Sequence, residues 1–222
     1  MTTQRVVLEI TTSLDGFVAG PDAGFEHPLG IGGMQIHEWA FATRAFCEHH
    51  GMPGGEAGPD SEVIEAHLAA VGATIMGRRM FSGGSGPWDG DPNASGWWGD
   101  EPPFRHPVFV LTHHAREPLE LGGGTTFTFV TGGVEQALEL ARVAAGDKNV
   151  AVSGGASVAQ QFVTRGLLDD LQIHVVPLLL GGGVQLFGSL EIDPVRLETT
   201  WVVASPTVTH LRFAMPKSAR DG

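Results

Sequence analysis

Short apolar, β-branched runs alternate along this chain with segments whose apolar positions recur every three or four residues. The runs predict strands and the helix-spaced segments predict amphipathic helices. The predicted strands cover residues 6–12, 73–76, 108–112, 126–130, 150–153, 171–179, 197–204 and 208–215. Because helices separate most of the early strands, the first two thirds are predicted to form an α/β unit with parallel neighbours.

Capping residues mark the predicted helices. Ser61 is a plausible N-cap for a helix over residues 62–71, and Gly133 and Gly146 bracket a second helix over residues 134–145. A third helix begins near Ala156, and residues 36–47 form a further helical patch.

The last third of the sequence has a different pattern. Long strands follow one another, and a Ser205-Pro206-Thr207 turn separates the final two. This pattern predicts an antiparallel edge on a mixed sheet. We expect one α/β domain over residues 1–222, with flexible loops at about 20–60 and 82–105, where glycine and proline are frequent.

Charge and composition exclude several classes of partner. The formal net charge of −12 over 222 residues argues against binding to nucleic acid or an anionic membrane. The apolar stretches are too short to span a bilayer. The lone Cys47 cannot form an intramolecular disulfide, and the opening residues lack the apolar core of a signal peptide, so a reducing cytoplasm is expected.

The first candidate site is a pair of glycines, Gly154 and Gly155, between the strand ending at Ser153 and the helix starting near Ala156. Glycine lets a ligand approach the backbone closely, and a helix N-terminus presents free N–H groups to an anion. The turn therefore suits a phosphate, although Gly-Gly between a strand and a helix is often only a tight turn.

Two other strand ends carry groups suited to an anion. Gly77, Arg78 and Arg79 follow one strand, and guanidinium groups bind phosphate through paired hydrogen bonds. Thr112 and His113 follow the next strand and offer a hydroxyl and an imidazole.

Together these segments resemble the dihydrofolate-reductase-like fold, and more closely the reductase domain of the riboflavin-biosynthesis deaminase-reductase (the RibD C-terminal domain). The closer resemblance rests on four further segments, Ser13-Leu14-Asp15-Gly16, residues 166–171, residues 176–183 and Leu186-Phe187. It implies a mixed sheet, mostly parallel with an antiparallel C-terminal hairpin and flanked by helices. It also implies NADPH as cofactor. The residues implied for its 2′-phosphate are Arg78, Arg79, Thr112 and His113, and those for its pyrophosphate are Gly154, Gly155, Ala156 and Ser157. Gly77 and Ser153 are further cofactor-binding candidates.

The substrate side departs from both patterns. Residues 66–70 lack the arginine of the riboflavin reductases, and Met80 replaces the threonine of the Gly-Arg-x-Thr motif of dihydrofolate reductases. The candidate catalytic acids are Asp15, at the tip of the first strand, and Glu38, which the resemblance compares with a pterin-binding carboxylate. Asp15 could equally be a turn residue, and Glu38 a solvated one. The candidate substrate-binding residues are His37, Trp39 and His174; a packed strand histidine is an equally good interpretation of His174.

The resemblance therefore predicts an NADPH-dependent reductase of a small heterocyclic substrate, similar to 5-amino-6-(5-phosphoribosylamino)uracil reductase. A dihydrofolate or other pterin reductase is the alternative, and a non-catalytic dinucleotide-binding protein is an alternative of another class. The resemblance also implies a homodimer, with the final antiparallel strands as the candidate interface. No metal is expected, because the paired histidines 49–50 and 113–114 lack the usual ligand spacing.

Overall fold

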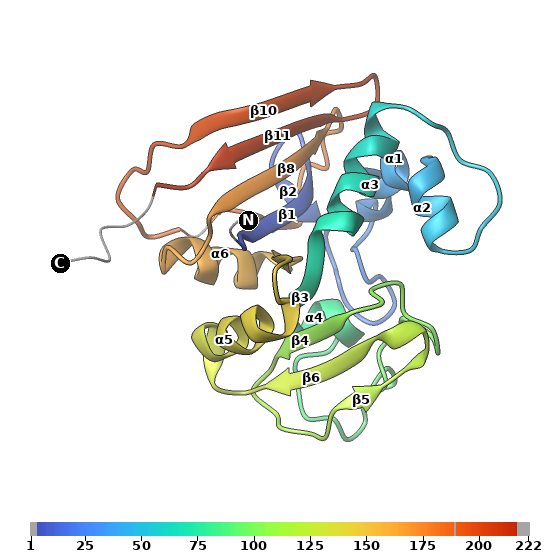
Figure 1. Ribbon diagram of the computed structural model, residues 1–222, viewed down its shortest axis with the longest axis vertical. Helices are drawn as coiled ribbons and strands as arrows, with labels where there is room; N and C mark the ends of the chain where they lie inside the picture. Colours follow the sequence, from blue (N-terminus) through green and yellow to red (C-terminus); the bar gives the residue numbers. More distant parts are fainter. Residues whose placement is uncertain (1–3, 189, 217–222) are drawn as a thin grey trace.

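A mixed sheet forms the centre of the computed structural model, which describes residues 4–188 and 190–216 (Figure 1). Among these residues the sheet has nine strands in the order β10-β11-β8-β1-β7-β3-β4-β6-β5. In chain order they are β1 (Val6–Ser13), β3 (Val71–Gly77), β4 (Pro107–Leu111), β5 (Leu119–Glu120), β6 (Thr126–Val130), β7 (Asn149–Val152), β8 (Asp170–Val176), β10 (Glu198–Ala204) and β11 (Thr209–Ala214).

The strand directions confirm the predicted mixed sheet. The six strands from β8 to β6 in the sheet order are parallel, so their carboxyl ends lie at one edge. The C-terminal strands β10 and β11 run antiparallel beside β8. Strand β5 adds a short antiparallel edge on the other side.

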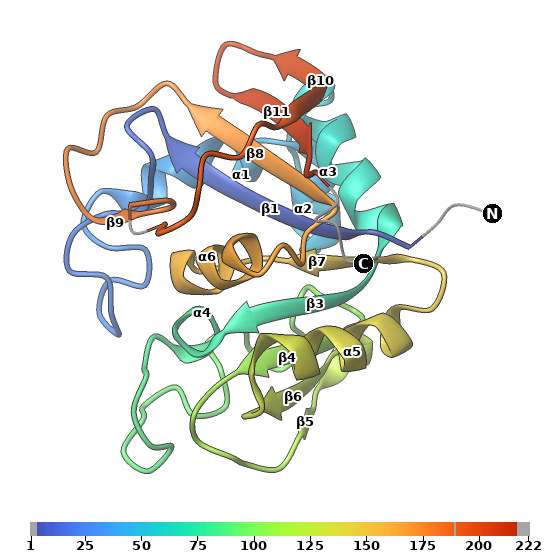
Figure 2. The same ribbon diagram turned by 90° about the vertical axis from the view of Figure 1, so that its left-hand side faces the viewer.

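Opposite faces of the sheet are covered by different helices (Figures 1 and 2). Helices α5 (Gly133–Ala145) and α6 (Ala156–Thr164) pack on one face, where Val6, Leu8 and Val150 belong to the main apolar core. Helix α3 (Pro59–Ala70) lies on the other face of β1, β8 and β11. Because side chains alternate along a strand, Glu9, next to Leu8, faces α3.

Two local expectations are wrong. Residues 36–47 do not form one helix but a 3-10 turn η1 (Gly33–His37), α1 (Glu38–Phe41) and α2 (Arg44–His49). Helix α3 begins at Pro59 with Gly58 at its N-cap, so Ser61 does not cap it. Proline suits the first helical turn, and the Ser61 hydroxyl instead accepts a hydrogen bond from the Ala45 amide, which ties α2 to α3.

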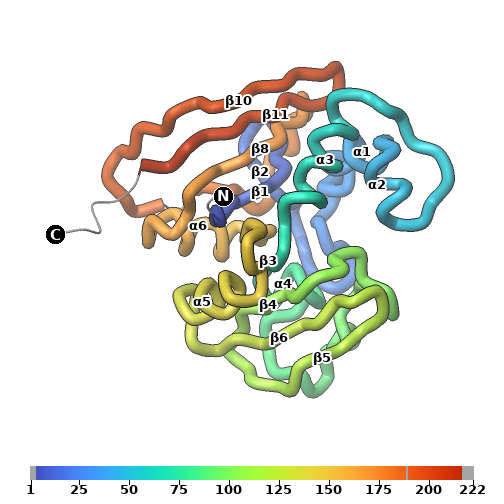
Figure 3. Tube along the Cα trace, viewed as in Figure 1, coloured from blue at the N-terminus to red at the C-terminus, as the bar shows by residue number. Residues whose placement is uncertain are grey.

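A second, two-stranded sheet pairs β2 (Phe17–Ala19) with β9 (Val184–Gln185) beyond the end of β1. The Gly-Arg-Arg segment opens the short helix α4 (Arg78–Ser82), and Gly122–Gly124 form a 3-10 turn, η2. Residues 83–106 then run to β4 without a helix or strand (Figure 3). No helix within the described ranges is long and apolar enough to cross a membrane.

Candidate functional site

Two of the predicted phosphate-binding turns meet at the carboxyl edge of the sheet. The Gly77 amide donates a hydrogen bond of 2.8 Å to the Gly154 carbonyl, and the Ser153 amide donates one of 3.0 Å to Ile75. Because β3 also pairs with β4, with Gly77 opposite Leu111, the turn carrying Thr112 lies beside them. The topology thus brings together three segments that are far apart in the sequence.

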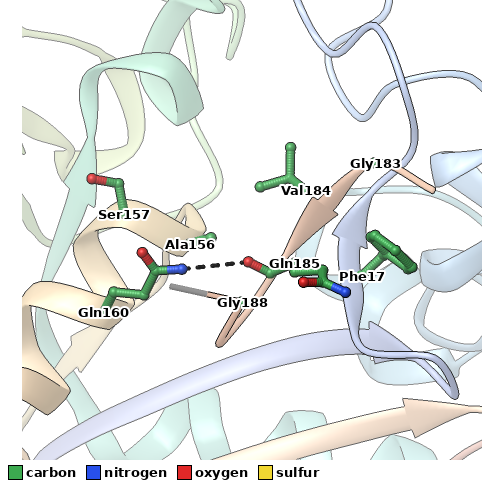
Figure 4. Close-up of a pocket in the computed structure, with 8 residues that line it drawn as sticks. All are labelled: Phe17, Ala156, Ser157, Gln160, Gly183, Val184, Gln185 and Gly188. Atoms are coloured by element: carbon green, nitrogen blue, oxygen red, sulfur yellow. Dashed lines mark hydrogen bonds between the residues drawn. The ribbon is translucent and has the colours of Figure 1, made fainter. Parts of the chain in front are cut away.

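The glycine turn leads directly into α6. Gly154 has φ = +106° and its peptide bond to Gly155 is cis, while Gly155 and Ser157 are exposed. Ala156 and Ser157 line a cavity of about 460 Å³ between the start of α6 and the β2–β9 sheet (Figure 4). Across this cavity Gln160 donates a hydrogen bond of 2.9 Å to the Leu186 carbonyl. The N-terminal amides of α6 therefore border a space large enough for a ligand.

The two arginines after Gly77 lie in different environments. Arg78 is 6% exposed, forms an ion pair with Asp91, and stacks over the Trp88 ring with its guanidinium carbon 3.6 Å from the centroid. Arg78 also donates a hydrogen bond to the Ser82 hydroxyl, so its guanidinium group is bound by partners inside the protein. Arg79 is exposed on α4. Of the two residues expected to bind a phosphate, Arg79 is the one whose charge is not already paired within a buried cluster.

Thr112 and His113 lie at the end of β4. The Thr112 hydroxyl is buried and accepts a hydrogen bond of 3.1 Å from the His114 amide, so it shapes the turn. His113 is exposed. The imidazole is therefore more accessible to a ligand than the hydroxyl.

Asp15 holds two loops together. Its carboxylate accepts hydrogen bonds from the Ser13 hydroxyl (2.6 Å) and from the amides of Leu180 (3.1 Å) and Gly181 (2.8 Å). The Ser13 bond, together with the two amides, lowers the pKa of Asp15. A carboxyl group held in its ionised form is a poor proton donor at neutral pH.

The segment 37–39 separates into exposed and buried parts. Glu38 is exposed in the first turn of α1. This short helix is not the one that leads into β3, which is α3. His37 is partly buried, and burial, with a contribution from His174, lowers its pKa to about 4. Trp39 is 6% exposed and packs on two histidine rings, His174 and His210, each with its centroid 5.0 Å away.

His174 belongs to a buried polar cluster that the sequence does not reveal. Its Nδ1 lies 2.7 Å from Nδ1 of His210, and its Nε2 lies 3.0 Å from Oε1 of Glu9. His210 Nε2 lies 3.0 Å from Oδ1 of Asp60, and His67 pairs with Glu9. The partners of His174 in this cluster come from three elements and share no sequence motif: Glu9 on β1, Asp60 and His67 on α3, and His210 on β11. Only the placement of β11 beside β8 would have indicated the cluster.

The cluster shifts the titration of its members. Burial acts to raise the pKa of Glu9, but His67 and His174 outweigh it and hold that pKa far below its ordinary value. Burial acts to lower the pKa of His67, and Glu9 overcomes it, so the net shift is upward. Both shifts favour the charged forms, so Glu9 and His67 stabilise each other as an ion pair. In the ranges 4–188 and 190–216, no group of three or more His, Cys, Asp or Glu side chains is placed to hold a metal ion.

The mixed sheet, its C-terminal hairpin and its flanking helices define a protein of the dihydrofolate-reductase-like fold. An Enterococcus faecalis dihydrofolate reductase, solved with NADP(H), superposes with a TM-score of 0.52 at 12% identity over 97% of this chain and 99% of that one. The chain belongs to the RibD C-terminal domain family, whose model matches residues 4–211. Membership of this family indicates an oxidoreductase.

Other solved structures share the fold. A protein from Shewanella sp. PV-4, described as a riboflavin biosynthesis protein, gives a TM-score of 0.62 at 23% identity over 96% of this chain and 99% of that one. A pyrimidine reductase-like protein from Corynebacterium diphtheriae gives 0.55 at 13% identity over 97% and 93%. The sequence has no significant match among curated proteins.

Proposed function

We propose that the protein is an NADPH-dependent reductase that transfers hydride to a small heterocyclic substrate. The observation that carries the proposal is the hydrogen bond between Gly77 and Gly154, which joins two turns suited to phosphate at the carboxyl edge of the sheet. Family membership and the NADP(H) complex of a protein with the same fold support a nicotinamide cofactor.

The exposed groups at this edge suggest how the cofactor lies. The pyrophosphate fits at the N-terminus of α6, against Gly155, Ala156 and Ser157. The 2′-phosphate fits between Arg79 on α4 and His113 after β4, which are exposed on adjacent strand ends. When bound, the cofactor supplies the hydride, and the protein orients it and supplies a proton to the substrate.

The substrate class we propose is an aminopyrimidine related to 5-amino-6-(5-phosphoribosylamino)uracil. The support is the family together with the riboflavin-pathway function named for one protein of the same fold, the Thermotoga maritima deaminase/reductase, of which this chain covers 57%. We also propose a homodimer. Its candidate interface is the edge strand β10, where Trp201 and Val202 are 36% and 54% exposed.

A titration with NADPH and NADH tests the cofactor. We expect NADPH to bind more tightly than NADH, and Arg79→Ala to weaken NADPH about tenfold or more, because a charge-assisted bond to a phosphate contributes about 1.5–3 kcal/mol. NADH binding should change little. Arg142→Ala, at an exposed arginine on α5, is the matched control. Equal loss for both nucleotides would remove Arg79 from the 2′-phosphate site, and no binding of either would refute the proposed cofactor.

A further inference from the structure

The face of the sheet beneath α3 is lined by polar side chains rather than apolar ones. His174 is paired in register with Thr11 on β1 and with His210 on β11, so all three side chains lie on the same face. The polar residues of this face are Glu9, Thr11, Gln172, His174, His210 and Arg212. Burying such groups is costly unless each is hydrogen-bonded, which makes their bonding pattern informative.

Three hydrogen bonds in series link two carboxylates through the two histidines. They join Asp60 to His210, His210 to His174, and His174 to Glu9 at 3.0, 2.7 and 3.0 Å. Each bond needs one proton. If both carboxylates are ionised, the histidine pair must carry three N–H groups, which is one more than two neutral imidazoles have. If the pair is neutral, the third proton must sit on one of the two carboxylates, and we assign it to Asp60 because the pKa of Glu9 is held far below its ordinary value. Asp60, His210 and His174 therefore share one mobile proton.

The position of this chain relates it to the proposed active site. His174 lies opposite Thr11, two residues before the carboxyl end of β1, and that edge holds the Gly77 and Gly154 turns. Trp39 covers both imidazole rings, and its buried Nε1–H has no acceptor among residues 4–188 and 190–216. A buried donor left without an acceptor is expected where a bound ligand completes the hydrogen bond.

We propose that the chain Asp60–His210–His174 stores the proton consumed by the reduction, with Asp60 as its outlet toward the substrate. This inference rests on the proposed reductase function. A proton moves from Nε2 of His210 to Asp60, and the substrate nitrogen or oxygen would take it as the Asp60 O–H bond breaks, while the cofactor, when bound, would supply the hydride for the new C–H bond. The histidine pair then carries two N–H groups instead of three, so it is neutral, with Asp60 ionised, until solvent reprotonates it.

The exposed fractions are consistent with Asp60 as the outlet. The side chains of His174 and His210 are 3% and 0% exposed, whereas those of Asp60 and Glu9, at the two ends of the chain, are 17% and 14% exposed. Because Glu9 is also paired with His67, we assign the outlet to Asp60. The hydroxyls of Ser205 and Thr207 donate to the same carboxylate at 2.9 and 3.2 Å, which orients it.

The surrounding charges are compatible with one proton on the pair. Burial lowers the pKa of His210 and outweighs the opposing effect of Asp60, so an extra proton on the pair depends on the three hydrogen bonds and the two neighbouring carboxylates. The remaining charged or titratable groups that face the pair come from four elements: Glu9 from β1, His67 from α3, His37 from η1 and Arg212, which donates to Gln172, from β11. His37 is neutral at pH 7, so only Glu9 and Asp60 compensate the pair directly.

Nitrogen-15 NMR of histidine-labelled protein tests the shared proton without requiring turnover. At pH 7 we expect three protonated ring nitrogens on His174 and His210 together, or two with a protonated Asp60 seen in a carboxyl-labelled sample. His174→Gln and His210→Gln assign the signals. Two protonated nitrogens with an ionised Asp60 would overturn the stored proton.

Steady-state NADPH oxidation with the aminopyrimidine substrate tests whether the reduction uses the shared proton. Glutamine can keep hydrogen bonds but cannot carry a proton, so His210→Gln should lower kcat about 100-fold, leave KM for NADPH unchanged and abolish the solvent deuterium isotope effect. His50→Gln, at the exposed histidine that follows the end of α2, is the control and should match the wild type. Full kcat with an unchanged pH profile in His210→Gln overturns the inference. No turnover by the wild type, with NADPH bound, refutes the proposed substrate instead.

Discussion

Arg78 and Arg79 show how much adjacent residues of one type can differ. In a helix, neighbouring side chains are about 100° apart. Arg78 consequently faces the protein, against Trp88 and Asp91, and Arg79 faces solvent. The sequence identifies the Gly-Arg-Arg segment but not which arginine is free, because that depends on where residues 83–106 place the partners of Arg78.

Replacing Arg78 should therefore reduce stability rather than cofactor discrimination. Arg78→Ala leaves the buried Asp91 carboxylate without its cation, and we expect a loss of about 3 kcal/mol or more in the free energy of unfolding. Urea denaturation measures it. Arg79→Ala is the matched control, since an exposed arginine should contribute less than about 1 kcal/mol. Equal stabilities of the two variants would contradict the internal role of Arg78.

The Glu9–His67 ion pair predicts a pH window of maximal stability. The lowered pKa of Glu9 contributes stability above its unfolded pKa of about 4.5, and this contribution is lost as the pH falls below that value. The raised pKa of His67 contributes stability below about 6.5, and this contribution is lost as the pH rises through the folded value. Stability measured by denaturation should thus be greatest between these limits. In Glu9→Gln the window should disappear, and its persistence would assign it to other groups.

At the scale of elements, the glycine turn before α6 combines two requirements. Gly154 has φ = +106°, a conformation that side chains disfavour, whereas Gly155 has φ = −71°, which any residue adopts. A Cβ on Gly154 would lie 3.4 Å from Ile10, an ordinary contact, so the restriction there is in the backbone. Gly154 is therefore needed for the backbone conformation of the turn, and Gly155 leaves space for a ligand at the N-terminus of α6.

The two glycines should respond differently to alanine. Gly154→Ala should destabilise the protein by about 1–3 kcal/mol because of its backbone conformation. Gly155→Ala should keep the stability within about 0.5 kcal/mol, since no atom lies within 4 Å of the added Cβ, but should weaken NADPH binding. Thermal unfolding and an NADPH titration separate the effects. Unchanged affinity in Gly155→Ala would argue against pyrophosphate at this turn.

The elements that sequence predicted well are those with strong local patterns. Helix α5 occupies residues 133–145, against the expected 134–145, because its apolar positions and Gly146 are unambiguous. The prediction of one helix over residues 36–47 is wrong because the segment is divided into three short elements, in which Trp39 packs against histidines of β8 and β11. The three-residue β2 and the two-residue strands β5 and β9 are too short to give a periodic signal.

At the scale of the whole molecule, the site depends on long-range pairing. Strand order places β1 between β7 and β8, so the glycine turn and the histidine pair lie on either side of the first strand. The proposed phosphate-binding edge could be predicted from sequence, because each strand end carries its own motif. The buried polar chain could not, because Asp60 and His210 are 150 residues apart.

The exposed edge strand predicts the assembly. Light scattering should give the mass of a dimer, and Trp201→Glu with Val202→Lys should give a monomer that still binds NADPH, because a charge on an apolar interface opposes association. Glu191→Lys, an exposed change before β10, is the control. A monomeric wild type would refute the dimer, and a dimeric double variant would move the interface away from β10.

The contact between Asp60 and the β10–β11 turn also affects how the chain folds while it is being synthesised. The partners of this carboxylate, Ser205, Thr207 and His210, follow Asp60 by 145, 147 and 150 residues in the sequence, so they are synthesised well after it. Until β11 has been synthesised, β8 is an unpaired edge of the sheet, and Asp60 lacks its partner His210. A nascent or truncated chain lacking β11 would therefore present a sheet edge to other chains, and the hairpin would close that route to aggregation only once β11 has been made.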